Sequence, residues 1–326
     1  MSIALAVPAP RAVDVSVLVP AKDEAENLPL FMRLAAEAFA QHPAARYEVV
    51  VIDDGSDDDS WAVLQQLEQE YSFLHAVRHR ARRGIADALR TGFLASRGDV
   101  LVFYPADLQF KPEDIPRLVA PILAGDSDMV TGYKQGRYEK AFVSGIYNGL
   151  SRRLFHIPVR DLNSVKAYRR EVMEELPVRP DWHRYMVVIA AAEGFKVTEI
   201  PVPLYPRHAG RSKFGLSRIP VGVLDMLGVW FELRFGKKPL LLFGMVGAAL
   251  FASGLVSGIV ALTWLLVTGV GTRAVWTAVQ TCLLLGGVFF VGGLLGELIA
   301  GQRAEVRELR RLVDDLRAER DGPRRD

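Results

Sequence analysis

Cysteine is nearly absent from the sequence: among 326 residues there is one, Cys282, and it lies in an apolar run. A single thiol excludes a disulfide framework and a cysteine-based zinc site within the chain. Histidine is also scarce, with six residues. His156, His183 and His208 stand apart in the sequence, without the spacing of a metal-binding pair, so we assign them no metal.

A large excess of one charge is missing as well. Forty basic residues stand against thirty-eight acidic ones, which gives a formal net charge of +2. This near balance counts against bulk attraction to nucleic acid. The sequence also lacks GxGxxG after its first predicted strand, and it lacks GxxxxGK[ST]. These absences count against a dinucleotide-dependent oxidoreductase and a P-loop NTPase.

Two long runs contain no charged residue. They cover residues 239–272 and 274–296, and only Arg273 separates them. Each exceeds the roughly 20 residues that a helix needs to cross a hydrocarbon core. Helices that are apolar all round are rare in water, so we predict a transmembrane hairpin over two buried helices of a soluble core. Small residues in both runs suit close helix contact: Gly244, Gly247, Ala248, Ser253, Gly254, Ser257 and Gly258 in the first, and Gly286, Gly287, Gly292, Gly293 and Gly296 in the second.

Basic residues flank the predicted hairpin on both sides. The positive-inside rule therefore predicts that both ends of the chain lie in the cytoplasm, in a multi-pass protein of the cell (inner) membrane. Residues 1–10 have no basic segment and too short an apolar stretch for a signal peptide. The flanking residues are Arg234, Lys237 and Lys238 before the first run, and Arg303, Arg307, Arg310 and Arg311 after the second.

Composition divides the chain into four predicted segments. Residues 1–216 form an α/β domain, 217–238 an amphipathic juxtamembrane helix, 239–300 two transmembrane helices, and 301–326 a charged cytosolic tail. In the second segment, apolar residues recur from Val221 to Phe231 at spacings of 3, 3 and 4. This pattern fits a helix lying on the membrane surface, and a last packed helix of the soluble domain is the alternative.

The tail contains a short apolar repeat with 3-4-3 spacing, formed by Val306, Leu309, Val313 and Leu316. The spacing fits a coiled-coil seam, which would imply a homo-oligomer. A solvated single helix is the alternative.

In the first segment, short β-branched runs alternate with helical patterns. Residues 15–19, 47–52, 73–77 and 99–104 are predicted strands, and stretches of 3.6-residue periodicity lie between them. This alternation predicts parallel strands with crossover helices, which is a doubly wound, Rossmann-like α/β sheet. Ligands of such sheets sit beyond the carboxyl ends of the strands.

Three acidic loops occupy these carboxyl ends: Pro20–Glu24, Asp53–Ser56 and Pro105–Gln109. Carboxylates there suit a divalent metal, sugar hydroxyls or the N–H edge of a base. Any one of these turns, taken alone, is equally well explained as a helix cap or an Asx-turn. Their shared location favours a binding site.

The order of several motifs is that of a known family. VSVLVPAKDEAENL, VVVIDDGSDDDS, GIADALRTGF and VLVFYPADLQFKPEDIPRL resemble family 2 glycosyltransferases of GT-A fold. RDLNSVKAYRREVMEEL and EIPVPLYPRHAGRSKFGLSRI, ahead of two apolar spans, are similar to the polyprenyl-phosphate glycosyltransferases. That group holds dolichyl-phosphate mannose synthases and undecaprenyl-phosphate glucosyl- and aminoarabinosyl-transferases. The resemblance runs from about Val15 to about Gly296.

The resemblance implies a donor site at the three acidic loops. The first two loops would hold the base and ribose of a nucleotide sugar, and the third would lie beside its diphosphate. Asp107 and Gln109 would be the ligands of Mg²⁺ or Mn²⁺. The nucleotide-sugar residues at these loops would be Pro20, Ala21, Asp23, Glu24, Asp53, Ala106 and Asp107.

The resemblance also implies a site for the acceptor. Asp161 would lie near the anomeric carbon, where the acceptor phosphate arrives; a loop aspartate bonded to backbone is the alternative. The implied catalytic residues are Asp161, Arg207, Arg211 and Lys213, of which the last three belong to a loop that would close on both the donor diphosphate and the acceptor phosphate. Ser212 of the same loop, together with Lys134 and Arg137, is implied to bind the nucleotide sugar through a phosphate.

Residues 200–224 contain no acidic side chain but several basic ones. Two anionic substrates must approach each other during transfer, so a basic loop suits the reaction. The alternatives are an ordinary solvated loop or a flank that contacts anionic lipid headgroups.

Two positions depart from the family pattern. Pro105 replaces the first Asp of the usual Asp-x-Asp, and Asp23 stands where the family often has Asn. Proline supplies no ligand, but Mg²⁺ often uses few protein carboxylates and takes phosphates and water instead. We therefore expect metal binding to persist through Asp107, Gln109 and the donor, with lower affinity.

The expected activity is transfer of a single sugar from a UDP- or GDP-sugar to undecaprenyl or dolichyl phosphate. It would take place at the cytosolic membrane face, with inversion and with help from a metal. One alternative is a glycosyltransferase with another lipid or a polysaccharide as acceptor. The other is a degenerate, non-catalytic nucleotide-sugar binder; this alternative rests on Pro105, which replaces the first Asp of the usual motif.

Overall fold

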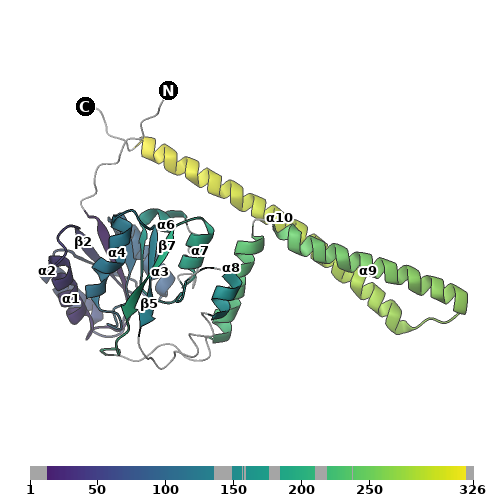
Figure 1. Cartoon of the computed structure of the whole chain (residues 1–326), viewed down its shortest axis with the longest axis horizontal. Coiled ribbons are helices and arrows are strands. Elements are labelled where there is room, and N and C mark those ends of the chain that lie inside the picture. Colours follow the sequence, from purple (N-terminus) through teal and green to yellow (C-terminus); the bar gives the residue numbers. More distant parts are fainter. Residues whose placement is uncertain are drawn as a thin grey trace. The chain divides into compact units, whose positions relative to one another are not determined.

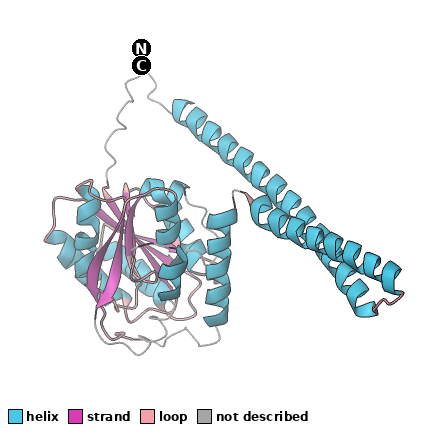
Figure 2. Cartoon of the chain, turned by 45° about the vertical axis from the view of Figure 1, so that its right-hand side comes forward, coloured by secondary structure: helices cyan, strands magenta, loops and turns pink. Residues whose placement is uncertain are grey.

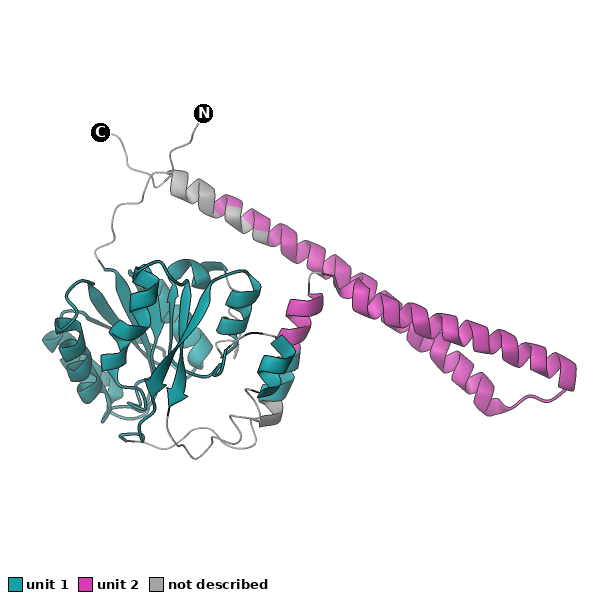
Figure 3. Ribbon diagram, viewed as in Figure 1, with its two compact units in different colours: residues 1–227 teal, residues 228–326 magenta. Residues whose placement is uncertain are grey.

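The computed structural model describes residues 13–135, 149–155, 157, 159–175, 184–209, 219–236 and 238–320. The chain forms two compact units, residues 1–227 and 228–326, and the division falls within helix α8 (Ile219–Phe235; Figure 3). The predicted segment boundaries at residues 216 and 238 therefore bracket α8, and they stay predictions.

The first unit is built on a mixed sheet of seven strands in the order β3-β2-β1-β4-β6-β5-β7, flanked by helices (Figures 1 and 2). The strands are β1 Val15–Ala21, β2 Tyr47–Asp53, β3 Leu74–Arg78, β4 Val100–Phe103, β5 Met129–Gln135, β6 Lys166–Arg169 and β7 Val197–Pro203. The helices are α1 Leu28–Ala40, α2 Ser60–Glu70, α3 Ile85–Ala95, η1 Pro112–Asp114, α4 Ile115–Leu123, α6 Arg170–Glu175 and α7 Met186–Ala192.

Strands β1 to β4 are parallel, as the alternation of the sequence predicts. β1 pairs with both β2 and β4, and Ala21 stands opposite Asp53 at the carboxyl ends of β1 and β2. β6 is different: it lies between β4 and β5 and is antiparallel to both. Because Lys166 pairs with Phe103, β6 begins at the edge where β4 ends.

The central strands β1, β2 and β4 are buried on both faces of the sheet, which explains their unbroken apolar runs. On one face, Val17 and Val49 pack with side chains of α1, α2 and α4. On the other, Leu18 and Ile52 pack against Leu89 of α3. The core thus fixes the strands rigidly and leaves their carboxyl-end loops to carry function.

Helix α8 begins in the first unit. The hydroxyl of Tyr185 donates to the carbonyl of Gly222 at 2.9 Å, and Met226 is buried. Leu224 and Leu227 are exposed, by 67% and 47%. An exposed apolar face agrees with the predicted helix at a membrane surface, which stays a prediction.

The second unit contains two long helices, α9 (Pro239–Thr268) and α10 (Arg273–Arg320). Both are long and apolar enough to cross a membrane, each with an 18-residue stretch of mean hydropathy 2.1, within residues 239–268 and 273–306 respectively. Few of their residues are buried within the unit, so the apolar side chains face outward. α10 continues without a break past residue 300 into the predicted tail. Val306, Leu309 and Val313 are exposed there, and the coiled-coil seam stays a prediction.

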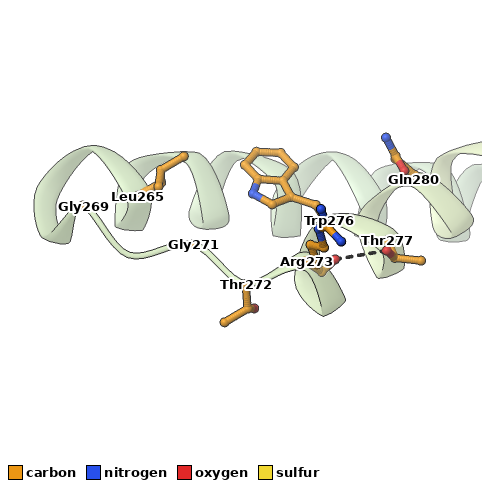
Figure 4. Close-up of a pocket in the computed structure, with 8 residues that line it drawn as sticks. All are labelled: Leu265, Gly269, Gly271, Thr272, Arg273, Trp276, Thr277 and Gln280. Carbon is orange, nitrogen blue, oxygen red and sulfur yellow. Dashed lines mark hydrogen bonds between the residues drawn. The ribbon is translucent and has the colours of Figure 1, made fainter.

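Glycines hold α9 and α10 together. A Cβ added to Gly247 would lie 2.6 Å from the backbone nitrogen of Phe290, and one added to Gly286 would lie 2.6 Å from that of Phe251. The backbones are therefore in direct contact, as the small-residue pattern predicts. The connection between the helices turns at Gly269, whose φ is 70°, and a hollow lined by Arg273, Trp276 and neighbouring residues lies beside it (Figure 4).

We expect Gly286→Ala to weaken the hairpin and Gly287→Ala to leave it intact. The Cβ at position 286 would meet backbone that has no room to move, whereas the Cβ at 287 meets nothing within 4 Å. Both changes gain roughly 1 kcal/mol of helix propensity, and overpacking at 286 costs about 1–3 kcal/mol. Thermal unfolding in detergent should show a lower midpoint for G286A only. Equal midpoints for the two variants would contradict the close contact.

Candidate active site

The first two acidic loops are joined by hydrogen bonds. The ammonium of Lys22 donates to the carbonyl of Gly55 at 2.7 Å and to Asp57 Oδ2 at 2.6 Å. The backbone N–H of Asp23 donates to Ser56 Oγ at 2.9 Å, and Asp23 itself has a positive φ of 53°. These bonds turn the chain sharply after β1 and hold the Pro20–Glu24 loop against the loop after β2.

The two adjacent aspartates after β2 have different surroundings. Asp53 is fully buried; its Oδ1 accepts from Ser56 N at 2.8 Å, and its Oδ2 lies 3.2 Å from Arg78 Nε. Asp54 holds the loop before α3, since its carboxylate accepts from the backbone N–H groups of Arg83 and Gly84 at 2.7 and 2.8 Å. Asp54 is therefore a structural residue. The predicted contact with the nucleotide sugar stays assigned to Asp53.

The loop after β4 converges on one guanidinium. Asp107 Oδ2 lies 2.9 Å from Arg207 Nη2, and Gln109 Oε1 accepts a hydrogen bond from the same nitrogen at 3.2 Å. The segment that carries the arginine is also fixed, because Tyr205 N donates to the carbonyl of Gln109 at 2.9 Å. Both predicted metal ligands thus face a common point, at which a cationic group lies.

Burial shapes the chemistry of this loop. Ala106 is buried, and Leu108 has a positive φ of 56°, which turns the chain so that Asp107 and Gln109 face the same way. Burial raises the pKa of Asp107, and the positive charge of Arg207 together with backbone N–H groups opposes the rise. Pro105 has neither a polar side chain nor a backbone N–H, so it offers only its carbonyl here.

Asp161, predicted near the acceptor phosphate, forms a second ion pair with Lys134, a predicted phosphate contact. Lys134, near the end of β5, places its ammonium 3.2 Å from Asp161 Oδ2 and donates to the carbonyl of Asn163 at 2.8 Å. Asp161 is almost fully buried, and its Oδ1 accepts from Asn163 N at 2.9 Å. Glu199 fixes the start of this loop by accepting from Arg160 N at 2.6 Å.

The structure thus brings the predicted residues together in three groups along one sheet edge: the first two loops, Asp107 and Gln109 with Arg207, and Asp161 with Lys134. Arg137, Arg211, Ser212 and Lys213 lie outside the described residues. Sequence reasoning assigned no role to Lys166, which is buried at the same edge. The available signal was a lysine within the otherwise apolar run VKAY, residues 165–168.

The described residues contain no group of three or more His, Cys, Asp or Glu side chains that would hold a metal by themselves. Asp107 and Gln109 nevertheless supply one carboxylate and one amide oxygen aimed at the same point. Mg²⁺ commonly takes one or two carboxylates and completes its shell with substrate phosphates and water. The donor set therefore fits a cation shared with the donor diphosphate, provided that Arg207 turns aside.

A mixed α/β sheet with acidic loops at the carboxyl ends of its parallel strands, followed by two apolar helices, defines the class as a GT-A-like glycosyltransferase. Residues 16–175 match the family described as Glycosyl transferase family 2, and the chain belongs to this family.

Two relatives align with nearly the whole chain. An undecaprenyl-phosphate 4-deoxy-4-formamido-L-arabinose transferase of Sodalis glossinidius is 31% identical over 318 residues, covering 95% of this chain and 92% of the relative. A dodecaprenyl-phosphate galacturonate synthase of Rhizobium johnstonii is 28% identical, covering 89% and 88%.

Solved structures confirm the fold of the first unit. Glucosyl-3-phosphoglycerate synthase of Mycobacterium tuberculosis, in complex with Mn²⁺, UDP and phosphoglyceric acid, has a TM-score of 0.54 at 19% identity. The match covers 68% of this chain and 78% of that one. The same enzyme with Mn²⁺, UDP-glucose and phosphoglyceric acid has a TM-score of 0.53 at 18% identity, covering 68% and 80%.

We expect Asp54→Asn to destabilise the first unit, because an amide nitrogen would face backbone donors that the carboxylate now satisfies. The loss should be about 1–3 kcal/mol of unfolding free energy, the usual cost of leaving a buried donor unsatisfied. Asp126→Asn, at an exposed residue after α4, is the control. Denaturant unfolding measures both. A D54N variant as stable as D126N would contradict the structural role of Asp54.

Proposed function

We propose that this chain transfers a single sugar from a nucleoside-diphosphate sugar to the phosphate of a polyprenyl lipid at the cytosolic membrane face. The observation that carries the proposal is the extent of the similarity to the Sodalis transferase, which spans 95% of the chain and so includes both apolar helices. A relative that shared only the sugar-nucleotide domain would leave the acceptor open. Both relatives described above are named for a prenyl-phosphate substrate or product.

The reaction is a single displacement. An oxygen of the acceptor phosphate forms a bond to the anomeric carbon from the face opposite the leaving group. The bond between this carbon and the donor's diphosphate oxygen breaks, and its electron pair leaves with the nucleoside diphosphate. Configuration at the anomeric carbon is inverted. A phosphate monoester is already ionised at neutral pH, with a second pKa near 6, so no strong general base is required.

The site must instead bring two anions together, and its ion pairs suit that task. Arg207 is held by Asp107, and Lys134 by Asp161, so each cation is fixed in place before substrate arrives. We assign Lys134 to the acceptor side and Arg207 to the donor diphosphate. In this assignment Asp161 orients Lys134 and the incoming phosphate, and removes no proton. Arg211, Ser212, Lys213 and Arg137 remain proposed phosphate contacts.

Asp107 and Gln109 would hold Mg²⁺ or Mn²⁺ together with the donor diphosphate. The positive charge supplied there would neutralise part of the charge on the departing diphosphate. Pro20–Glu24 and Asp53 would bind the base and ribose, and Ala106 would lie beside the diphosphate.

The membrane would present the acceptor to this edge of the sheet. α9 and α10 are proposed to anchor the chain in the inner membrane as a multi-pass hairpin, with both termini in the cytoplasm, because basic residues flank the hairpin on both sides. A homo-oligomer formed through the exposed apolar residues of the tail is proposed as well.

The direct test is turnover by the full chain in nanodiscs. UDP- and GDP-sugars are screened with undecaprenyl phosphate, with and without Mg²⁺ or Mn²⁺, and the lipids are analysed by mass spectrometry. We expect one donor to give a singly glycosylated prenyl phosphate. A product on diacylglycerol or polysaccharide instead would identify a different acceptor. Binding of a nucleotide sugar without any product would identify a non-catalytic binder.

We expect Arg207→Ala to bind Mn²⁺ more tightly than the unmodified protein when no nucleotide is present. Arg207 occupies the point where Asp107 and Gln109 converge, so it competes with the metal for both oxygens. One lost charged contact corresponds to roughly tenfold in affinity. Electron paramagnetic resonance of free Mn²⁺ measures the binding. Arg90→Ala, which removes an exposed charge on α3, is the control; equal affinity in R207A and R90A would contradict the competition.

A further inference from the structure

Lys166 is a buried cation that the mechanism above does not use. Its side chain is 1% exposed, and it stands at the first position of β6, opposite Phe103 of β4 and Thr131 of β5. Paired residues of adjacent strands project from the same face, so the three side chains line one spot beneath the sheet edge. A lysine is seldom buried without a paired charge, which makes its surroundings informative.

The ammonium of Lys166 has few hydrogen-bond acceptors. Among the described residues it donates to one, the carbonyl of Ser164 at 2.8 Å, and it lies 5.7 Å from the centroid of the Phe103 ring. An ammonium has three donors. Next to it, Thr131 Oγ1 is buried without a hydrogen-bond partner in the described part of the chain. The spot is therefore polar and incompletely satisfied by the protein.

Three charged side chains face Lys166, and two of them, Asp161 and Lys134, are predicted site residues. Its ammonium interacts with Asp161 from the loop before β6, with Lys134 from β5, and with Arg184 from the segment before α7. β4 contributes Phe103 at this spot, which is uncharged. Lys134 and Asp161 already form a pair at 3.2 Å, and this pair by itself has no net charge. Adding Lys166 gives these three side chains a net charge of +1, and the guanidinium of Arg184 adds further positive charge.

We propose that Lys166 is a positioning residue for the transfer reaction: its ammonium balances Asp161 from inside the fold, so that Lys134 presents a net positive charge to a substrate phosphate. The inference rests on the proposed function, because it assumes a phosphate at this site. The phosphate is that of the prenyl acceptor or that of the donor diphosphate, and the experiment separates the two. A buried excess of one charge is costly by itself and becomes favourable when an anion arrives.

The protonation of Lys166 gives this role a pH signature. The pKa of Lys166 is lowered to about 7, chiefly by burial; Asp161 opposes this fall, and the positive charges of Lys134 and Arg184 contribute to it. Below pH 7 the ammonium is present in the substrate-free protein, and above pH 7 it is progressively lost. The KM for the phosphate substrate should therefore rise between pH 6 and pH 8.5. An arginine stays charged throughout this range.

The test compares Lys166→Met, Lys166→Arg and the unmodified chain in nanodiscs at pH 6 to 8.5. The KM for prenyl phosphate is measured at saturating nucleotide sugar, and the KM for nucleotide sugar at saturating prenyl phosphate. Lys196→Met, which removes an exposed lysine at the opposite edge of the sheet, is the control. Ionisation of the acceptor is the same for all proteins, so ratios of KM at each pH isolate the effect of residue 166.

We expect K166M to raise KM about tenfold at pH 6 with a smaller change in kcat, and K166R to keep a low KM up to pH 8.5. The ratio of the KM of the unmodified chain to the KM of K166R should rise with pH.

A change confined to the KM for prenyl phosphate identifies the acceptor as the source of the anion, and a change confined to the KM for nucleotide sugar identifies the donor. A ratio that is flat with pH, or a K166M that matches K196M, would overturn the proposal. Should K166M fail to fold, the K166R profile alone decides. Failure of the proposed function is separate, because the unmodified chain would then form no glycosylated prenyl phosphate.

Discussion

The parallel pairing of β1 with its two neighbours is the constraint on which the rest of the molecule depends. It brings the Pro20–Glu24, Asp53–Ser56 and Pro105–Gln109 loops to one edge of the sheet, although they are far apart in the sequence. The antiparallel β6 begins at the same edge, opposite the end of β4, and adds Asp161 and Lys166 to it. Without that pairing the acidic loops would be separate surface turns.

At this edge each described cation of the proposed mechanism is held by an acid. Asp107 fixes Arg207, and Asp161 fixes Lys134. A nearly neutral protein that must admit two phosphate-bearing substrates gains from such an arrangement, because the cations are in place and compensated before either substrate arrives. In the proposed mechanism, a bound phosphate would replace the carboxylate as the partner of each cation. Electrostatic preorganisation of this kind is commonly the largest contribution to transfer catalysis.

Much of the fold could be predicted from the sequence. β-branched runs gave β1 to β4 within one or two residues, because strands buried on both faces leave an unbroken apolar signal. The two apolar helices and their glycine contacts could be predicted in the same way. Strand β6 could not be predicted, because its four residues, with a lysine at the first position, carry no strand pattern.

The site could be predicted only in part. Parallel topology placed the three acidic loops at one edge. Arg207 and Lys134 entered only through the resemblance, as phosphate contacts, and their pairing with Asp107 and Asp161 was not predicted, since Arg207 lies 100 residues from Asp107 in the chain. Nothing in the sequence Asp53-Asp54 shows that Asp54, and not Asp53, holds the loop before α3. The difference depends on backbone N–H groups of Arg83 and Gly84, whose positions only the folded chain fixes.

The central claim is that this edge receives an anionic lipid. The most direct measurement is the initial rate of sugar transfer to undecaprenyl phosphate and to undecaprenol, in identical nanodiscs and with the same donor. We expect glycolipid from the phosphate alone, because a neutral alcohol offers no anion to the cations at this edge. Comparable rates with both lipids would contradict it.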